Sequence, residues 1–297
     1  MVSLFSYLEK GKFKYQRNFN LKDISSIKIG PKTDVFIEPE NIGALADILT
    51  YLEGGAYNYR VIGALTNTLF ASRHYTGVIV STSRMRSIWQ RGKEIFAECG
   101  VRLSALMSYA ERLGLGGFPG LCHIPGCIGA AVRGNVGAFG NEISDIFVEG
   151  SFLNKKGEII NLSHSDMNFG YRTSMLKGEA LTLLSAGFML SELPTFSIQA
   201  AREECLRLRK NTQPLGERSL GSVFMRHNGV SAGYYIDKAG LKGYRIGDAA
   251  VSTKHAGFIV NLGNAVADDV LLLIEYIKKV VFEEFDVRLK EEIEIIS

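Results

Sequence analysis

The chain has 297 residues, of which 46% are hydrophobic and 22% are charged, and its formal net charge is +3. This composition is typical of a globular protein with a large core and excludes a disordered or fibrous chain. The small net charge predicts no general affinity for nucleic acid or for a membrane surface.

The cysteines favour a reduced protein with buried thiols, because Cys99, Cys122, Cys127 and Cys205 contain no Cys-x-x-Cys pair. Cys122, His123 and Cys127 lack a fourth metal ligand and a usual zinc spacing, so we predict no metal site. We find no signal peptide and no apolar run of membrane-spanning length. We therefore expect a cytoplasmic protein.

The first part of the chain alternates between predicted strands and helices. Strands are indicated at residues 33–38, 59–62, 77–81 and 94–98. Leu45, Ile48, Leu49 and Leu52 predict one amphipathic helix, and Leu103, Leu106, Ala110 and Leu113 predict the face of a second. The strand at 59–62 runs directly into the turn Gly-Ala-Leu-Thr-Asn at residues 63–67.

Residues 122–140 form a glycine-rich segment that contains a single Lys, Arg, Asp or Glu side chain, Arg133. We predict an irregular loop here, neither helix nor strand, anchored in the core by Ile128 and Val132. Its five glycines, at positions 126, 129, 134, 137 and 140, would allow positive φ angles and close approach of another molecule. Composition alone supports a cofactor-binding loop and a tightly packed loop equally well.

The second half of the chain begins with a predicted hairpin, in which strands at 145–153 and 158–162 flank a turn at 154–157. A strand at 180–190 and a boundary at Pro194 follow. The next helix buries Ile198, Ala201, Cys205 and Leu208 and has an arginine-rich opposite face. A long helix at about 268–285 buries Val270, Ile274, Ile277, Val281 and Phe285, and residues 287–296 alternate like a strand.

Four motifs in order resemble the UDP-N-acetylenolpyruvoylglucosamine reductases, the flavoenzymes of peptidoglycan synthesis known as MurB. They are the Ile-Pro-Gly to Gly-Ala-Phe-Gly segment at 124–140, Phe-Gly-Tyr-Arg-Thr-Ser at 169–174, Gln-Pro-Leu with Gly-Ser-Val-Phe within 213–224, and Val-Ser-Thr-Lys-His-Ala-Gly-Phe-Ile-Val-Asn at 251–261. Together the motifs span almost the whole chain. Such an ordered set is far more specific than any one glycine loop.

The resemblance implies an α+β fold, namely an FAD-binding fold of the vanillyl-alcohol-oxidase/PCMH type with a MurB C-terminal substrate domain. Residues 1–77, joined by the C-terminal strand 286–297, would form one FAD-binding α/β lobe. Residues 78–192 would form the second lobe, and residues 193–285 would form the substrate-binding domain.

The resemblance also implies an activity: NADPH-dependent reduction of UDP-N-acetylglucosamine enolpyruvate to UDP-N-acetylmuramate, with noncovalent FAD. It implies a small-molecule substrate, and we expect no nucleic acid, membrane or obligate protein partner. Two alternatives stay open. One is an FAD-dependent alcohol oxidase or dehydrogenase of the same wider fold, and the other is a flavin-binding protein that has lost catalysis.

Three residues match the catalytic positions of the family. Ser222 would donate a proton to the intermediate, Arg172 would polarise the substrate carboxylate, and Glu292 would help to stabilise the developing charge. A guanidinium stays charged at any working pH and can meet a carboxylate with two parallel hydrogen bonds. The alternation of residues 287–296 by itself places Glu291 on the apolar face and so favours Glu291 as the catalytic acid, whereas the motif favours Glu292.

The resemblance assigns two sets of binding residues. FAD would be bound by Gly63, Ala64, Leu65, Thr66, Asn67, Pro125, Gly126, Gly129, Ala130, Asn135, Gly137 and Ala138. The substrate would be bound by Arg209, Lys210, Gln213, Gly221, Lys254 and His255, although a solvated basic helix face explains the cations among them equally well.

Three features depart from parts of the family. Leu65 stands where the family has glycine, and a side chain there costs about 1 kcal/mol or more if the backbone is left-handed. Phe139 replaces a tyrosine, and we expect it and Tyr171 to serve in packing. The interval between Arg172 and Ser222 is too short for the inserted tyrosine loop of one family branch, so the chain resembles the other branch.

Overall fold

The computed structural model describes all residues from Met1 to Ser297, and the chain forms two compact units. Unit 1 comprises Met1–Phe19, Asp34–Gly63 and Thr76–Arg207, and unit 2 comprises Asn20–Thr33, Ala64–Tyr75 and Leu208–Ser297. The C-terminal third of the chain therefore shares a unit with two short segments from its first quarter. The division into two flavin lobes and a substrate domain stays a prediction.

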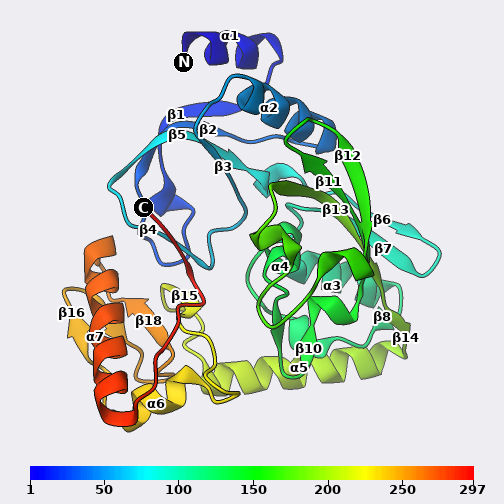
Figure 1. Ribbon diagram of the computed structural model, residues 1–297. Helices are drawn as coiled ribbons and strands as arrows, with labels where there is room; N and C mark the ends of the chain where they lie inside the picture. Colours follow the sequence, from blue (N-terminus) through cyan, green and yellow to red (C-terminus); the bar gives the residue numbers. More distant parts are fainter. The chain divides into compact units, whose positions relative to one another are not determined.

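Unit 1 is built on two sheets (Figure 1). The four-stranded sheet has the order β1-β2-β5-β3, in which β3 and β5 are parallel. The five-stranded sheet has the order β12-β11-β13-β7-β6 and is antiparallel throughout. Their strands are β1 (Tyr15–Asn20), β2 (Lys32–Ile37), β3 (Tyr59–Ile62), β5 (His74–Ser81), β6 (Ile88–Arg91), β7 (Glu94–Glu98), β11 (Phe147–Asn154), β12 (Ile159–Ser163) and β13 (Leu181–Met189).

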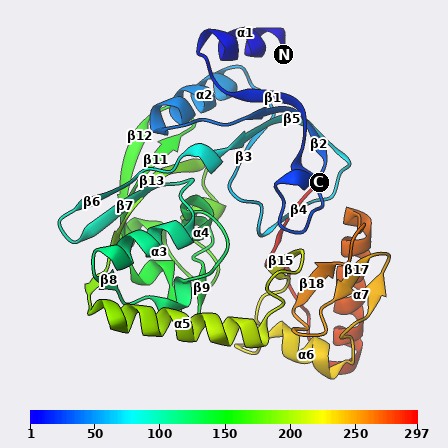
Figure 2. The same cartoon turned by 180° about the vertical axis from the view of Figure 1, so that it is seen from behind.

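Short elements complete unit 1. The two-residue strands β8 (Leu115–Gly116) and β14 (Ser191–Glu192) pair with each other, as do β9 (Gly137–Ala138) and β10 (Asn141–Glu142). The helices are α1 (Val2–Lys10), α2 (Ile42–Gly54), α3 (Leu103–Arg112) and α4 (Ile128–Arg133). Helices α1 and α2 lie side by side in both views (Figures 1 and 2), and Tyr7 stacks on Tyr51 with ring centroids 3.7 Å apart.

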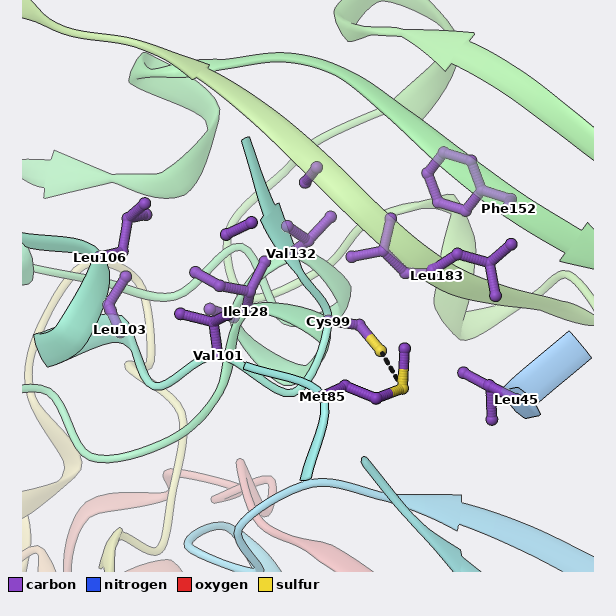
Figure 3. Close-up of a cluster of buried hydrophobic side chains, with 14 of the residues drawn as sticks. Leu45, Met85, Cys99, Val101, Leu103, Leu106, Ile128, Val132, Phe152 and Leu183 are labelled. Atoms are coloured by element: carbon purple, nitrogen blue, oxygen red, sulfur yellow. Dashed lines mark hydrogen bonds between the residues drawn. The ribbon is translucent and has the colours of Figure 1, made fainter. Parts of the chain in front are cut away.

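The core of unit 1 joins the sheets to the helices (Figure 3). Helix α2 buries the four leucine and isoleucine residues that its periodicity predicts, and α4 packs against β13 and β7. Met85, Cys99, Ile128 and Phe152 are each at most 2% exposed, and burial of such a side chain contributes about 1.5–3 kcal/mol. All four cysteines of the chain are free and buried, as predicted.

The predicted hairpin at 145–162 is confirmed by the antiparallel pairing of β11 with β12. Gly157 has a φ of +80° and donates its N–H to the Asn154 carbonyl at 3.0 Å. A left-handed backbone is accessible to glycine at little cost, so this residue closes the turn.

The prediction that the glycine-rich segment is an irregular loop without helix is wrong, because six of its residues form the helix α4. Ile128, Ala131 and Val132 fall on one face at helical spacing, and their burial stabilises a helix that glycine content disfavours. Among its five glycines only Gly126 and Gly140 have positive φ angles. Gly137 is needed for close packing instead, since a Cβ there would lie 2.4 Å from the Asn141 carbonyl oxygen.

Helix α5 (Thr195–Thr212) begins directly after Pro194, and the division between the units falls within it. Cys205 is buried on the predicted face. Arg209 is only 5% exposed, although it belongs to the face that the sequence predicts to be solvated. No helix of the chain combines the length and hydrophobicity that crossing a bilayer requires.

Unit 2 contains a four-stranded sheet of order β15-β18-β17-β16, against which α7 packs (Figure 2). A separate parallel pair joins β4 to the C-terminal strand β19. The elements are β4 (Thr68–Phe70), β15 (Ser219–Ser222), α6 (Ala232–Lys238), β16 (Arg245–Ile246), β17 (Ala249–Val251), β18 (Phe258–Asn261), α7 (Ala267–Phe285) and β19 (Glu294–Ile296).

Three predictions at the ends of elements are wrong. Leu113 is 42% exposed because α3 ends at Arg112, and Phe285 is 36% exposed at the last residue of α7. The C-terminal strand covers only residues 294–296, and its alternation changes phase, so Ile296 is buried in place of Ile295. The phase changes because residues 290–292 bond to 223–225 and residues 294–296 pair with β4.

Candidate active site

Ser222 and Glu292 come together in unit 2 although 70 positions separate them in the sequence. Ser222 ends β15 opposite Phe258, and its Oγ donates to the Phe224 carbonyl at 3.3 Å. The Glu292 N–H donates to the Val223 carbonyl at 2.8 Å, so the C-terminal segment runs directly beside the serine. Asn67 joins them, since its Nδ2 donates to the Glu292 carbonyl at 3.1 Å.

The two neighbouring glutamates have different surroundings. Glu291 Oε1 accepts a hydrogen bond from Lys278 Nζ of α7 at 2.9 Å, and the hydrogen bonds of Lys278 to Glu275 and to Glu291 raise the pKa of Lys278. An ion pair of this kind can account for a partly buried carboxylate that has no catalytic role. The Glu291 that the alternation singles out is thus paired with Lys278, and the motif-based choice of Glu292 stays a prediction.

His255 lies beside Ser222 on the loop between β17 and β18. A Cβ placed on Gly257 would lie 3.0 Å from His255 Cε1 and 3.4 Å from Ser222 Oγ, so the ring and the hydroxyl flank the same glycine. His255 Nδ1 accepts the Gly257 N–H at 3.1 Å. Burial lowers the pKa of His255 below its ordinary value, which favours a neutral ring in this position.

The predicted substrate residues form a second group in unit 2. Arg209 Nη1 donates to Gln213 Oε1 at 3.2 Å, and Lys254 Nζ donates to the main-chain oxygen of Lys210. The loop that carries His255 is thereby tied to the end of α5. Gly221 has a φ of +79°, and a Cβ placed on it would meet no atom within 4 Å, so open space lies next to Ser222.

The turn at 64–67 supplies the remaining predicted site residues of unit 2. Leu65 has a φ of +46°, so this position requires the left-handed backbone that the family's glycine provides. Its side chain is buried, and its carbonyl accepts hydrogen bonds from the N–H and the hydroxyl of Ser26, both at 3.2 Å. Burial and these bonds offset the cost of about 1–2 kcal/mol for a leucine in this conformation.

We expect the Leu65→Gly variant to have a higher free energy of unfolding than the Leu65→Ala variant. Both changes remove the same buried side chain, but alanine keeps a Cβ that the left-handed backbone disfavours. The difference should be about 1 kcal/mol in urea denaturation of the flavin-free protein. Leu69, buried in β4 without a positive φ, is the matched control, and there alanine should be the more stable replacement. The same order at both positions would contradict strain at Leu65.

Arg172 lies in unit 1 at the tip of a tight turn that Gly170 and Thr173 close with two hydrogen bonds of 3.1 Å. Its φ is +55°, a rare conformation for a side chain of this size. Nη2 donates to the Gly137 carbonyl at 2.6 Å and Nη1 to the Asn135 carbonyl at 3.4 Å. The guanidinium is thus oriented by the glycine-rich segment.

The predicted flavin residues of unit 1 follow the same segment. Pro125 and Ala130 are exposed, Gly126, Gly129 and Ala138 are partly exposed, and Gly137 is buried. A Cβ on Gly63 would lie 2.2 Å from Cys127 Sγ, so only glycine fits there. Asn135 is buried, and all three of its side-chain hydrogen bonds go to the protein.

Two expectations about aromatic residues are wrong. Phe139 is 47% exposed and Tyr171 is 42% exposed, so neither is a packing residue of the core. Both lie on tight turns with positive φ angles nearby, at Phe139 itself and at Arg172. A turn at the surface directs its side chains away from the core, which composition does not reveal.

Glu142, which is not among the predicted site residues, has its Oε1 3.7 Å from Arg172 Nη1. One signal was present. Glu142 is the first acidic residue after a stretch of 20 positions, 122–141, in which Arg133 is the single charged side chain apart from histidine. A carboxylate at the edge of an uncharged, glycine-rich segment is a candidate partner for a distant cation.

Two parts of the chain match models of known protein families. Residues 33–163 match the FAD binding domain model, and residues 213–296 match the C-terminal domain model of UDP-N-acetylenolpyruvoylglucosamine reductase. Berberine bridge enzyme from Eschscholzia californica is similar over 65% of this chain and 44% of its own, with a TM-score of 0.51 at 15% identity, which supports the fold alone. The fold and the site thus define an FAD-dependent oxidoreductase.

Relatives that match over the full length identify the family. The UDP-N-acetylenolpyruvoylglucosamine reductase of Caldicellulosiruptor saccharolyticus is 40% identical over 98% of this chain and 94% of its own, and that of Listeria innocua is 37% identical over 94% of each. The chain belongs to this family. The crystal structure of the Thermus caldophilus enzyme, MurB, has a TM-score of 0.83 at 31% identity and covers 96% of this chain and all of its own.

The residues present fit the FAD that the family requires. At Gly126 and Ala130 the main chain of unit 1 is accessible beside small uncharged side chains, whereas Pro125 has no N–H and the Gly129 N–H donates to the Cys99 carbonyl at 2.8 Å. In unit 2, Thr66 and Asn67 add a hydroxyl and an amide on accessible positions. Main-chain N–H groups and small polar side chains are what the phosphates of a dinucleotide need.

Proposed function

We propose that the chain reduces UDP-N-acetylglucosamine enolpyruvate to UDP-N-acetylmuramate through Ser222, Arg172 and Glu292. Noncovalently bound FAD would supply the hydride, taken from NADPH, that the enolpyruvyl double bond requires. The observation that supports these residues best is the hydrogen bond of 2.8 Å that joins the Glu292 N–H to the carbonyl of Val223, next to Ser222. The product is a precursor of peptidoglycan.

Ser222 is the proposed proton donor. Its Oγ–H has only a long hydrogen bond of 3.3 Å to the Phe224 carbonyl, so little is lost when the hydroxyl turns towards a substrate. A serine hydroxyl is a weak acid in water. It can protonate carbon only if a strongly basic carbanion lies beside it and water is excluded.

Arg172 is the proposed stabiliser of charge that spreads onto the substrate carboxylate. Its guanidinium donates hydrogen bonds to two neutral groups, the carbonyls of Gly137 and Asn135. These carbonyls orient the guanidinium, whose positive charge suits a carboxylate of the substrate. Glu292 would act on the same developing charge from the C-terminal segment.

The substrate residues proposed for the nucleotide half are Arg209, Lys210, Gln213, Lys254 and His255. Their support is the pair of contacts that joins the end of α5 to the loop of His255. Cations at this position suit a diphosphate. We also propose that the enzyme works in the cytoplasm without an obligate protein, nucleic acid or membrane partner.

An alcohol oxidase of the same wider fold is the less favoured function. Residues 213–296, which contain Ser222 and the loop of His255, match a reductase C-terminal domain, and an oxidase function leaves this match unexplained.

We expect the purified protein to be yellow and to lose its flavin absorbance when NADPH is added without oxygen. Addition of the enolpyruvyl substrate should restore the absorbance, because reduced flavin passes its hydride on. The two half-reactions can be followed separately through the visible flavin absorbance in a stopped-flow instrument. Reduction by NADPH without reoxidation by substrate would contradict the proposed function, whereas reoxidation by oxygen alone would favour an oxidase.

A further inference from the structure

We infer that Glu142, acting through Asn135, is a positioning residue that holds Arg172 in its working orientation. The inference rests on the proposed role of Arg172 in the reductase reaction. Glu142 belongs to a cluster that we call the Arg172 clamp, which comprises Asn135, Gly137, Glu142, Gly170 and Arg172.

Besides the link through Asn135, Glu142 is connected to the guanidinium directly and through the main chain of Gly137. Directly, Arg172 Nη1 lies 3.7 Å from Glu142 Oε1. Through the main chain, Arg172 Nη2 donates at 2.6 Å to the carbonyl of Gly137, and Gly137 is the strand partner of Glu142 in the β9–β10 pair. A Cβ on Gly137 would lie 2.7 Å from Glu142 Cγ, so the two residues are packed as closely as glycine permits.

Asn135 links the carboxylate to the backbone of the arginine turn. Its Nδ2 donates to Glu142 Oε2 at 2.9 Å and to the Gly170 carbonyl at 3.0 Å, and its Oδ1 accepts the Ser144 N–H at 2.9 Å. Both amide hydrogens and the amide oxygen are therefore used, which fixes the orientation of the side chain. Asn135 and Arg172 both have positive φ angles, of +40° and +55°. These contacts hold two rare backbone conformations in place.

The charges of the clamp suit a positioning role. Glu142 Oε2 accepts a hydrogen bond from the neutral amide of Asn135 at 2.9 Å, whereas Glu142 Oε1 lies 3.7 Å from Arg172 Nη1, which is too long for a hydrogen bond. The carboxylate thus attracts the guanidinium without fully neutralising it. A cavity of about 430 Å³ borders Glu142 and Asn135, so water can reach Asn135 if the carboxylate is removed. Loss of Glu142 should loosen the clamp without leaving a dry void.

The test compares Glu142→Ala and Glu142→Gln with Arg172→Ala in the flavin-loaded enzyme. We expect Glu142→Ala to slow reoxidation of reduced flavin by the substrate about 10- to 100-fold, because a displaced guanidinium loses its alignment. Reduction by NADPH should be unchanged. Glu142→Gln keeps an acceptor for Asn135 and should recover most of the rate. The matched control is Glu149→Ala, which removes another partly exposed glutamate of unit 1 that pairs with an arginine, at 2.9 Å from Arg91.

A double-mutant cycle separates this inference from the function on which it rests. If Glu142 acts only through Arg172, Glu142→Ala should have no further effect in the Arg172→Ala background. Additive effects of the two changes, or a normal reoxidation rate in Glu142→Ala while Arg172→Ala is slow, would overturn the positioning role. A normal rate in Arg172→Ala itself would instead remove the proposed role of Arg172.

A second measurement needs no flavin. In the flavin-free protein, Glu142→Ala should accelerate hydrogen exchange at the Thr173 amide, because Asn135 no longer holds the Gly170 carbonyl to which that amide donates. The exchange of amides in β11 and β13 should not change, which distinguishes a loosened clamp from a misfolded unit. Unchanged exchange at Thr173 would contradict the link through Asn135.

Discussion

Ser222→Ala is expected to slow the reoxidation of reduced flavin by the enolpyruvyl substrate by about 10²- to 10⁴-fold, the usual contribution of a positioned proton donor. Reduction of the flavin by NADPH should keep its rate, because that step needs no proton from this side chain. Rapid mixing of the reduced enzyme with substrate measures the first rate, and mixing of the oxidised enzyme with NADPH measures the second.

The fold should survive this change. The hydroxyl makes one long hydrogen bond, to the Phe224 carbonyl, and its loss costs about 1 kcal/mol or less. Ser219→Ala, in the same strand β15, is the matched control and should leave both rates unaltered. If Ser222→Ala damages both half-reactions equally, Ser222 is a structural residue of the turn and another group supplies the proton.

Glu292→Ala is expected to slow the same reoxidation by about 10²-fold or more, whereas Glu291→Ala should leave it within about twofold of the natural enzyme. The reason is the different use of the two carboxylates: Glu291 pairs with Lys278 at 2.9 Å. Loss of that partly exposed pair should lower the free energy of unfolding by about 1 kcal/mol or less. Stopped-flow reoxidation and urea denaturation of both variants provide the comparison.

The two variants serve as controls for each other, because they remove the same group from adjacent positions of one segment. A slow Glu291→Ala enzyme with a normal Glu292→Ala enzyme would reverse the assignment. It would also show that the alternation of residues 287–291 is a better guide to the site than the family motif.

Local patterns predicted the elements whose burial repeats regularly. Strands β3 and β7 begin and end at the predicted residues, and helix α2 buries its four predicted side chains. These predictions succeed because the spacing of apolar residues is set by the backbone repeat of the element itself. They fail at Leu113 and Phe285, where the repeat continues past the last well-packed turn of a helix.

Helix α4 is an element that the local pattern failed to predict. Its glycine content opposes a helix, but burial of Ile128, Ala131 and Val132 overrides that preference. Packing against β13 and β7 supplies the stabilisation, and those strands lie about 50 and 30 residues away in the sequence. A local pattern contains no information about such partners.

The sequence by itself determined the family, the cofactor and the segments that carry Ser222, Arg172 and Glu292, because ordered motifs record chemical requirements residue by residue. Only the tertiary structure decided that Glu291 binds Lys278, that Asn67 and Glu292 meet, and that Glu142 bonds to Asn135 and lies 3.7 Å from Arg172. The physical reason is that these contacts join backbone segments 7 to 225 positions apart. Their geometry depends on how strands and turns pack, and no spacing within one segment encodes it.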